Sequence, residues 1–430
     1  MNNHIIEHHI PKEAEGTYYT IPFPVPEGLE RVTVSYSYKR LSGAVGRLRD
    51  MVNVVDLGLM DGEGRFLGWS GGARDTVFVG PYASTKGYKM TGLTPGEWQI
   101  IVGAYQIPAG GLPVRYEVTY TPKGPRWLSG DLHMHSDASD GQHDMFTLAG
   151  MALKEGLDFI AVANHNNTAE NLHLPVVPGL TLLSAVEWTH YRGHMNFFGV
   201  AEPFENSFIA NSEEEMLALV ADAKAKGALV SVNHPKCGLC PYLWDSEDCF
   251  DLVEVWNGPM RKANLDAIAW WHDMLMSGRK IPLVGGSDYH KDKQPVRFAH
   301  PITRVYAQSP GAGDILAAIA GGHSYVTSSV DGVVLDMRCG NAGIGDTIVL
   351  HEGLALSVSA ENLRVGTRLK LVTSDGTAAE WKRFSNQTIA AQIPVLPSWR
   401  FAYLIASKTL MGRELVRAVS NPVYFDGASP

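Results

Sequence analysis

Histidine and carboxylate side chains gather in one short stretch, residues 130–144, which reads GDLHMHSDASDGQHD. Side chains of a strand alternate between its two faces, so Asp131, His133 and His135 would share one polar face opposite an apolar one. Asp140 follows in a segment typical of a turn that leaves a strand. Such a strand end is either a crowded polar surface or one wall of a metal site.

The surrounding sequence favours the metal site. From about residue 127 to 330, segments typical of strands alternate with segments typical of helices, which predicts a mainly parallel α/β domain. Twelve of the 16 histidines lie in this part of the chain. The expected helices are 213–226 and 262–277, and the expected strands are 131–135, 158–164, 181–188, 194–200, 228–233, 251–256 and 281–286. Seven strands with intervening helices suggest a (βα) barrel, incomplete or distorted.

Potential metal ligands stand at or just beyond the carboxyl ends of these strands, except His194, which precedes its strand. In a parallel barrel those ends converge on one face. A single histidine is more often an ordinary surface or core residue, but nine donors at corresponding positions favour a shared site. Imidazole and carboxylate suit Zn, Mn or Fe(II), and nine donors exceed the needs of one ion, so we expect two or three divalent ions. Glu187 could bridge two ions about 3.5–4 Å apart, as in two-metal hydrolases. The nine are His133, His135, Asp140, His165, Glu187, His194, His234, Asp288 and His290.

Four motifs, in this order and spacing, resemble those of the PHP (polymerase and histidinol phosphatase) family: GDLHMHSDASDG, GLDFIAVANHN, NHP and GGSDYH. They span residues 130 to 290. The stretches LGWSGGAR (67–74) and VEWTHYRGHMNFFG (186–199) are similar to segments of the carbaryl-hydrolase-like branch of that family.

The resemblance implies a distorted (βα)7 barrel with up to three metal ions. It implies that a hydroxide bridging the first two ions is the nucleophile, and that the third ion orients the substrate with nearby cations. Carried over residue by residue, the first ion would be held by His133, His135, Glu187 and Asp288, the second by Glu187, His194 and His234, and the third by Asp140, His165 and His290.

This chain departs from the family in two places. Asn164 stands where the family commonly has Asp before the motif-two histidine, which puts metal affinity at the third position in doubt because an amide is not an anionic partner. The loop after His234 contains Cys237 and Cys240 in a CxxC, which we do not associate with the family. A lone CxxC is a weak zinc signal, and a plain loop is the commoner meaning.

The flanking sequences predict two further domains. Residues 1–125 read as short strands separated by turns, with strands expected at 18–25, 31–38, 98–105 and 114–121, which indicates an N-terminal β-sandwich. The PHP barrel would occupy 126–330. Strands return without helices over 331–430, which indicates a C-terminal β-sandwich.

We therefore expect a metal-dependent hydrolase of a small-molecule ester, with Glu187, His194 and Asp288 in the machinery. A phosphate mono- or diester is favoured, and a carbamate or carboxyl ester is the alternative. Phosphate would be surrounded by cations, for which Arg297 is preferred to Lys291 and Lys293. The alternative needs an apolar wall, and one residue of 190–192 could act as a general acid. Candidates for the wall are Trp188, Tyr191, Trp256 and Tyr289.

Composition excludes several other classes of function. A formal net charge of −9 and the lack of basic patches argue against nucleic acid or an anionic membrane as partner. No apolar run approaches a membrane span, no secretory signal is recognisable, and four cysteines favour a reducing setting, so we expect a cytoplasmic protein. A carbohydrate-binding protein with a structural metal is less favoured, since structural sites close at four ligands.

Overall fold

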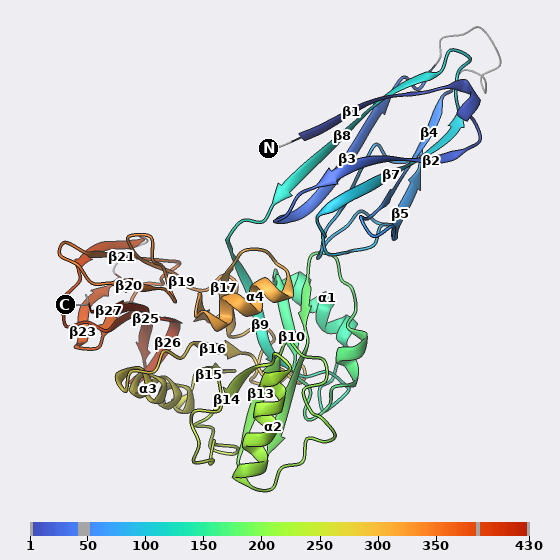
Figure 1. The fold of residues 1–430 in the computed structure, drawn as a ribbon. Helices are drawn as coiled ribbons and strands as arrows, with labels where there is room; N and C mark the ends of the chain where they lie inside the picture. Colours follow the sequence, from blue (N-terminus) through green and yellow to red (C-terminus); the bar gives the residue numbers. More distant parts are fainter. Residues whose placement is uncertain (1–2, 42–51, 384–387, 428–430) are drawn as a thin grey trace. The chain divides into compact units, whose positions relative to one another are not determined.

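The computed structural model describes residues 3–41, 52–383 and 388–427 (Figure 1). The chain divides into two units, one formed by Met1–Gly124 with Val176–Gly179 and the other by Pro125–Pro175 with Leu180–Pro430. Among the described residues, no helix has both the length and the apolar character needed to cross a membrane.

The first unit consists of two four-stranded antiparallel sheets that share one apolar core. Alternation creates this core: in Tyr18–Val25 the side chains of Ile21, Phe23 and Val25 are buried while their neighbours are exposed. The strands expected at 18–25, 31–38, 98–105 and 114–121 are confirmed. One sheet has the order β1 (Asn3–Ile10), β8 (Leu112–Pro122), β3 (Leu29–Tyr38), β6 (Thr76–Val79), and the other β2 (Tyr18–Val25), β7 (Gly96–Gln106), β4 (Val54–Met60), β5 (Phe66–Gly71).

The second unit places the seven strands expected for the barrel in two sheets. The first sheet is antiparallel from β12 to β14 and parallel from β14 to β16. The expected strand 181–188 is interrupted at Ser184, so its halves join different sheets. The first sheet has the order β12 (Ala185–His190), β13 (Gly193–Phe198), β14 (Leu229–Asn233), β15 (Leu252–Asn257), β16 (Leu283–Gly286), and the second begins with β11 (Thr181–Leu183), β10 (Phe159–Val162), β9 (Arg126–Met134), β17 (Ile302–Ala307), β18 (Ser324–Thr327).

Isolated backbone bridges connect the two sheets at the end that carries the histidines. Met134 at the end of β9 pairs with Tyr289 after β16, and His165 after β10 pairs with Glu187 in β12. The first bridge joins β9 to the segment after β16, and the second joins the segment after β10 to β12, but the continuous ladders remain two separate sheets. The structure is therefore a mixed α/β fold with several sheets, and the closed barrel stays a prediction.

The described residues of the second unit form four α-helices. Ser212 caps helix α2 (Glu213–Ala225), since its side chain accepts a hydrogen bond from the Glu215 amide at 3.2 Å. Helix α3 packs against β15, and α4 against β17. The expected helices 213–226 and 262–277 are confirmed, and two helices that the sequence analysis did not name complete the set: α1 (Met145–Glu155), α2 (Glu213–Ala225), α3 (Lys262–Met276) and α4 (Ala312–Ala320).

The C-terminal strands continue the second sheet, because β18 pairs with β26 in an antiparallel ladder. The predicted boundary near residue 330 therefore falls inside one compact unit, between β18 and β19, and stays a prediction. Beyond β18 the second sheet continues in the order β26 (Arg413–Ser420), β25 (Phe401–Leu410), β22 (Arg368–Thr373), β23 (Gly376–Lys382). In the same sheet, β27 (Val423–Asp426) pairs with β25 and with β20 (Thr347–Val349). A separate three-stranded sheet has the order β19 (Val334–Cys339), β21 (Ala355–Glu361), β24 (Ile389–Pro394).

Candidate metal centre

All nine predicted donors come together at one end of the strands of the second unit. Most follow the carboxyl ends of parallel strands, as expected. His194 lies at the start of β13, where it faces Thr189 of β12 and Asn233 of β14 across antiparallel ladders. Because β13 runs opposite to its neighbours, its beginning lies beside their ends. This antiparallel pairing explains the one donor that precedes its strand.

Glu187 occupies the centre of the group, and its two carboxylate oxygens face different histidines. Oε1 lies 3.1 Å from Nδ1 of His194, 3.2 Å from Nε2 of His234 and 3.4 Å from Nε2 of His133. Oε2 lies 2.8 Å from Nδ1 of His165 and 3.6 Å from Nε2 of His135. The side chain is buried. One carboxylate with a separate set of histidines at each oxygen has the arrangement needed to bridge two ions.

Asp288 is the second carboxylate of the group. Its Oδ1 lies 3.1 Å from Nε2 of His135, 3.5 Å from Nε2 of His133 and 3.6 Å from Nδ1 of His290. The sets of donors close enough to share one ion include His133, His135 and Glu187 together, and His133, His234 and Asp288 together. The residues that the resemblance assigns to the first ion therefore surround a common space.

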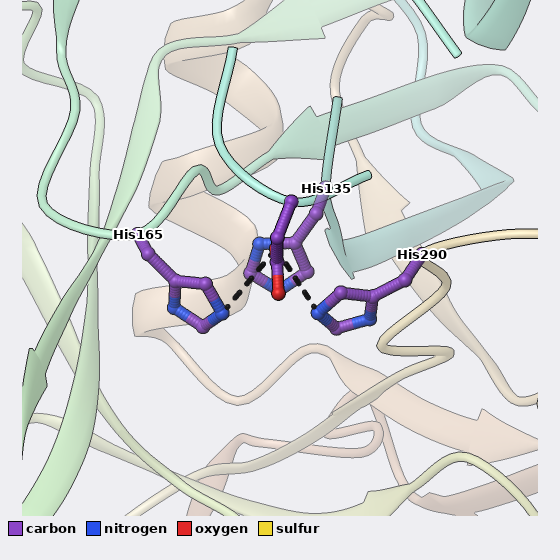
Figure 2. Close-up of side chains that lie close together, drawn as sticks. His135, His165 and His290 are labelled. Carbon is purple, nitrogen blue, oxygen red and sulfur yellow. Dashed lines mark ion pairs between the residues drawn. The ribbon is translucent and has the colours of Figure 1, made fainter. Parts of the chain in front are cut away.

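A further set of donors gathers around Asp140, in the loop that follows β9. Oδ1 of Asp140 lies 3.6 Å from Nε2 of His165 and 3.4 Å from Nε2 of His290, and these ion pairs are drawn in Figure 2. The His135 ring stands between them, with ring centroids 4.3 Å from His165 and 4.1 Å from His290. The set matches the residues assigned to a third ion, with His135 added.

The electrostatics of the group favour bound positive charge. Burial disfavours a charged imidazole, yet Glu254, Glu187 and Asp288 raise the pKa of His133 well above its usual value. Burial alone would raise the pKa of Glu187, but the neighbouring histidines, His133 first, lower it well below its usual value. Burial lowers the pKa of His135 to about 4, so that ring is neutral near pH 7, as a metal ligand must be.

Three buried atoms of the group lack a hydrogen bond of good geometry among the described residues, namely Nε2 of His133, Nδ1 of His135 and Oε2 of Glu187, and the last of these lies at ion-pair distance from His165. Buried polar atoms without partners are rare and costly, because each has lost its hydration. Nε2 of His133 faces Glu187 and Oε2 of Glu187 faces His165, so both point into the donor cluster. In the neutral His133 ring and the ionised Glu187 carboxylate, both atoms carry lone pairs that a divalent ion accepts. The residues present therefore fit a centre of divalent ions with nitrogen and oxygen ligands.

Backbone strain and close packing hold two of the donors. His234 and Asp288 adopt positive φ angles of 28° and 53°, which non-glycine residues rarely do. Such strain persists where the surrounding structure enforces it, and it concentrates at functional sites. A Cβ atom on Gly286 would lie 2.7 Å from the backbone nitrogen of His133, so only glycine allows β16 to approach β9 this closely.

Glu254 is a residue of the site that the sequence analysis missed. It lies buried in β15, where Oε1 is 2.9 Å from Nδ1 of His133 and Oε2 accepts a hydrogen bond from the His234 amide at 2.9 Å. Its contact with Nδ1 turns Nε2 of His133 towards Glu187 and fixes the tautomer. The available signal was a carboxylate inside the otherwise apolar run LVEVW (252–256).

Asp131 shares the polar face of β9, as predicted, but it binds backbone rather than the other donors. Its carboxylate accepts hydrogen bonds from the amides of Ser287 at 2.9 Å and Ala299 at 3.2 Å. Burial raises the pKa of Asp131 to about 6. These bonds hold the loop that carries Asp288 and His290 against β9.

Asn164, the departure from the family pattern, binds the loop that carries Asp140. Its Oδ1 accepts hydrogen bonds from the Ser136 amide and from Oγ of Ser139, both at 2.9 Å. Its Nδ2 donates to Oε2 of Glu170 at 2.8 Å. The amide thus combines an acceptor for the loop with a donor for a neighbouring carboxylate, which an aspartate at this place could not do when ionised.

The CxxC lies beside the donor cluster. Sγ of Cys240 is 3.5 Å from Nδ1 of His234, and Cys240 joins His194 and His234 as a set able to share one ion. All described cysteines are free thiols. A thiolate is a softer ligand than imidazole or carboxylate and favours zinc.

A cavity of about 510 Å³ lies next to His194 and Cys240. Of the four aromatic residues predicted for an apolar wall, only Tyr191 lines it. His190 also lines it, and burial, followed by Arg192, lowers the pKa of that ring. No lysine or arginine is among the lining residues, which are Asn166, Thr189, His190, Tyr191, His194, Phe208, Ile209, Ala210, Asn211, Leu239 and Cys240.

Arg297, the predicted anion-binding residue, lies elsewhere. It lines two cavities that contain none of the nine donors, one of them together with Trp256. Lys291 and Lys293 are exposed. Trp188 is buried in the core, and Tyr289 is buried with its hydroxyl donating to Asp292 at 2.6 Å. A role for Arg297 in binding the substrate stays a prediction.

The chain is structurally similar to PHP-like metal-dependent phosphoesterases and to an amidohydrolase. A two-domain protein from Bacteroides vulgatus, containing a predicted PHP-like metal-dependent phosphoesterase, is 18% identical, with 69% of this chain and 96% of that chain covered and a TM-score of 0.41. A protein from Bifidobacterium adolescentis assigned as a metal-dependent phosphoesterase is 18% identical (40% and 90% covered, TM-score 0.28). An amidohydrolase from Chromobacterium violaceum with bound sulfate and no metal is 15% identical (39% and 89%, TM-score 0.27).

No protein-family model matches the sequence, and no curated protein matches it.

Proposed function

We propose that this chain is a metal-dependent hydrolase of the PHP type, which cleaves an ester bond in a small molecule. One observation carries the proposal: nine nitrogen and oxygen donors, Glu187 and Asp288 at their centre, converge in sets close enough to share an ion. A structural metal site closes at four ligands, so this excess favours two or three ions and catalysis.

Divalent ions bound there would lower the pKa of a coordinated water and neutralise charge that develops on a phosphoryl or carbonyl oxygen. The protein's contribution is geometric. Glu187, held by a hydrogen bond from Nδ2 of Asn233 at 2.9 Å, presents its two oxygens to different histidines and would hold two ions. Glu254 fixes the ring of His133, and Asp131 fixes the loop of Asp288.

His190 is placed to contact the substrate from the wall of the cavity. Its Nδ1 accepts a hydrogen bond from the Arg192 amide at 3.0 Å, so the proton of the neutral ring resides on Nε2. From there it can donate a hydrogen bond to the leaving group. This assigns His190, rather than Tyr191 or Arg192, the predicted role of assisting the leaving group.

The sequence favours a phosphate ester. The side chains that line the cavity indicate which leaving group fits. Its wall of Phe208, Ile209, Ala210 and Leu239 contains no side chain that would bind a charged group at a distance from the metals. A leaving group that is apolar or aromatic therefore fits better than a polyanionic one. This observation supports the second candidate function, hydrolysis of a carbamate or carboxyl ester, alongside hydrolysis of an aryl phosphate.

The deciding experiment is a hydrolysis assay of the protein reconstituted with Zn or Mn. The panel contains 4-nitrophenyl phosphate, bis(4-nitrophenyl) phosphate, 4-nitrophenyl acetate and an aryl N-methylcarbamate. Asp288→Ala should abolish turnover. Asp137→Asn is the matched control, because Asp137 is an exposed carboxylate of the Asp140 loop outside the donor set, and it should retain turnover.

Turnover of a phosphate ester would assign the chain to the phosphoesterases, and turnover of only the acetate or carbamate would favour the second candidate. An absence of turnover with every metal, in protein shown to bind metal, would refute the hydrolase proposal.

A further inference from the structure

A second concave region lies in the same unit as the metal centre but shares no lining residue with it. It consists of two adjoining cavities, of about 430 Å³ and about 280 Å³, which have Arg297, His300, Ser328 and Arg417 in common. Their volumes suit a small molecule. We call this pair of cavities the basic cleft.

The larger cavity concentrates positive charge. Arg297, Arg364, Lys408 and Arg417 line it, against one carboxylate, Asp331. Within the described ranges, none of the four cationic groups has a carboxylate at ion-pair distance, whereas six other lysines and arginines of the second unit do have one. Like charges brought together without partners repel, so their grouping is stabilised by an anion.

The cations come from segments far apart in the sequence. Arg297 and His300 lie in the loop after β16, Arg364 lies between β21 and β22, and Lys408 and Arg417 belong to β25 and β26. The Ser328 amide donates to the carbonyl of Arg417 at 3.2 Å, which fixes the floor of the cleft. Lys408 is held by a hydrogen bond from Nζ to the carbonyl of Val365 at 3.1 Å.

The smaller cavity is apolar away from the shared residues. Its wall consists of Trp256, Pro259, Met260, Pro295, Pro301, Leu415 and Val416. The basic cleft therefore has cationic side chains at one end and aromatic and aliphatic side chains at the other. A ligand that fits it has an anionic group at one end and an apolar group at the other.

We propose that the basic cleft binds a small organic anion, with its phosphate or carboxylate against Arg297, Arg364, Lys408 and Arg417 and its apolar part against Trp256. Arginine forks match both groups in geometry. The site is separate from the metal centre, and its occupancy is independent of the proposed hydrolysis.

Isothermal titration calorimetry of the full chain at low ionic strength tests this proposal. The probes are 2-naphthylphosphonate and 2-naphthoate, which separate the two anionic groups and resist hydrolysis, and neutral 2-naphthamide. We expect saturable binding of at least one anion and much weaker binding of the amide. The double variant Arg364→Gln/Lys408→Gln should weaken anion binding roughly tenfold or more, since each hydrogen bond to a charged group contributes substantially.

Lys89→Gln/Lys154→Gln is the matched control, because it removes the same charge from exposed sites outside the cleft. It should change the affinity by less than about twofold. Arg364→Lys keeps the charge and should retain most of the binding, which separates loss of charge from loss of structure. The absence of saturable anion binding, or equal affinities in the cleft double variant and the wild type, would overturn the proposal.

Discussion

Asn164→Asp introduces the residue that the PHP family commonly has at this place in its motif, and we expect it to destabilise this chain. Asn164 differs from an aspartate in donating Nδ2 to Oε2 of Glu170 at 2.8 Å and to Oγ of Ser136 at 2.9 Å. The substitution replaces the donor by a second carboxylate oxygen beside Glu170. A hydrogen bond thereby becomes a repulsive contact.

The size of the effect follows from these contacts. A hydrogen bond to a charged group contributes about 1.5–3 kcal/mol. Two like charges about 4 Å apart repel by about 4 kcal/mol at an effective dielectric constant near 20. Glu170 is partly exposed, so solvent screens this repulsion, and a carboxyl group can also take up a proton. We therefore expect the free energy of unfolding to fall by about 2–4 kcal/mol near pH 7.

Urea unfolding of the wild type, Asn164→Asp, Glu170→Gln and the double variant measures this loss. The double variant exchanges the carboxylate and the amide, so it should recover most of the stability. The repulsion raises the pKa of the introduced carboxyl in the folded state. The deficit is then complete above that pKa and should shrink as pH falls towards the unfolded value of about 3.9. A single variant as stable as the wild type at pH 7 would refute the reasoning.

Three further substitutions test the site. Glu254→Gln weakens the partner of His133 and should lower metal affinity by about 10–100-fold, measured by competition with a chelator; unchanged affinity would mean that Glu254 does not orient the ring. Cys240→Ser replaces a soft donor by a hard one, and elemental analysis after incubation with equal Zn and Mn should show a lower share of Zn. An unchanged ratio would exclude the thiol from the ligand set. Gly286→Ala places a methyl group against His133 and should cost about 1–3 kcal/mol in urea unfolding; wild-type stability would show that the strands can separate.

The sequence identified the donors because strand ends are readable from periodicity, and ends of neighbouring strands converge. His194 is the exception, because that rule assumes parallel strands. Its strand runs antiparallel, and pairing direction depends on the short turn between β12 and β13 rather than on hydrophobic pattern. Glu254 was not predicted, for a different reason. It lies within a strand and contacts the donors from the side, so its position relative to the strand end could not identify it.

The four strands expected in the first unit and the two expected helices within 213–277 followed from alternation and from helix start and stop signals, which are local properties. Which strands pair is not local. The interruption at Ser184 sends the two halves of one expected strand to different sheets, and the ladder between β18 and β26 joins residues about ninety positions apart. Neither feature alters the hydrophobic pattern of its own segment.

Asp131, a buried residue, positions both the metal donors that the sequence predicted and the basic cleft that the structure revealed. Asp131 binds the amide of Ser287 at one end of the loop after β16 and the amide of Ala299 at the other. Between these two bonds the loop carries Asp288, which faces the histidines, and Arg297, which faces the basic cleft. Both bonds end on a single carboxylate in β9, so the spacing between the metal donors and the cleft is set by the strand that also carries His133. A loop fixed at both ends in this way can hold two different binding groups without being part of any helix or sheet.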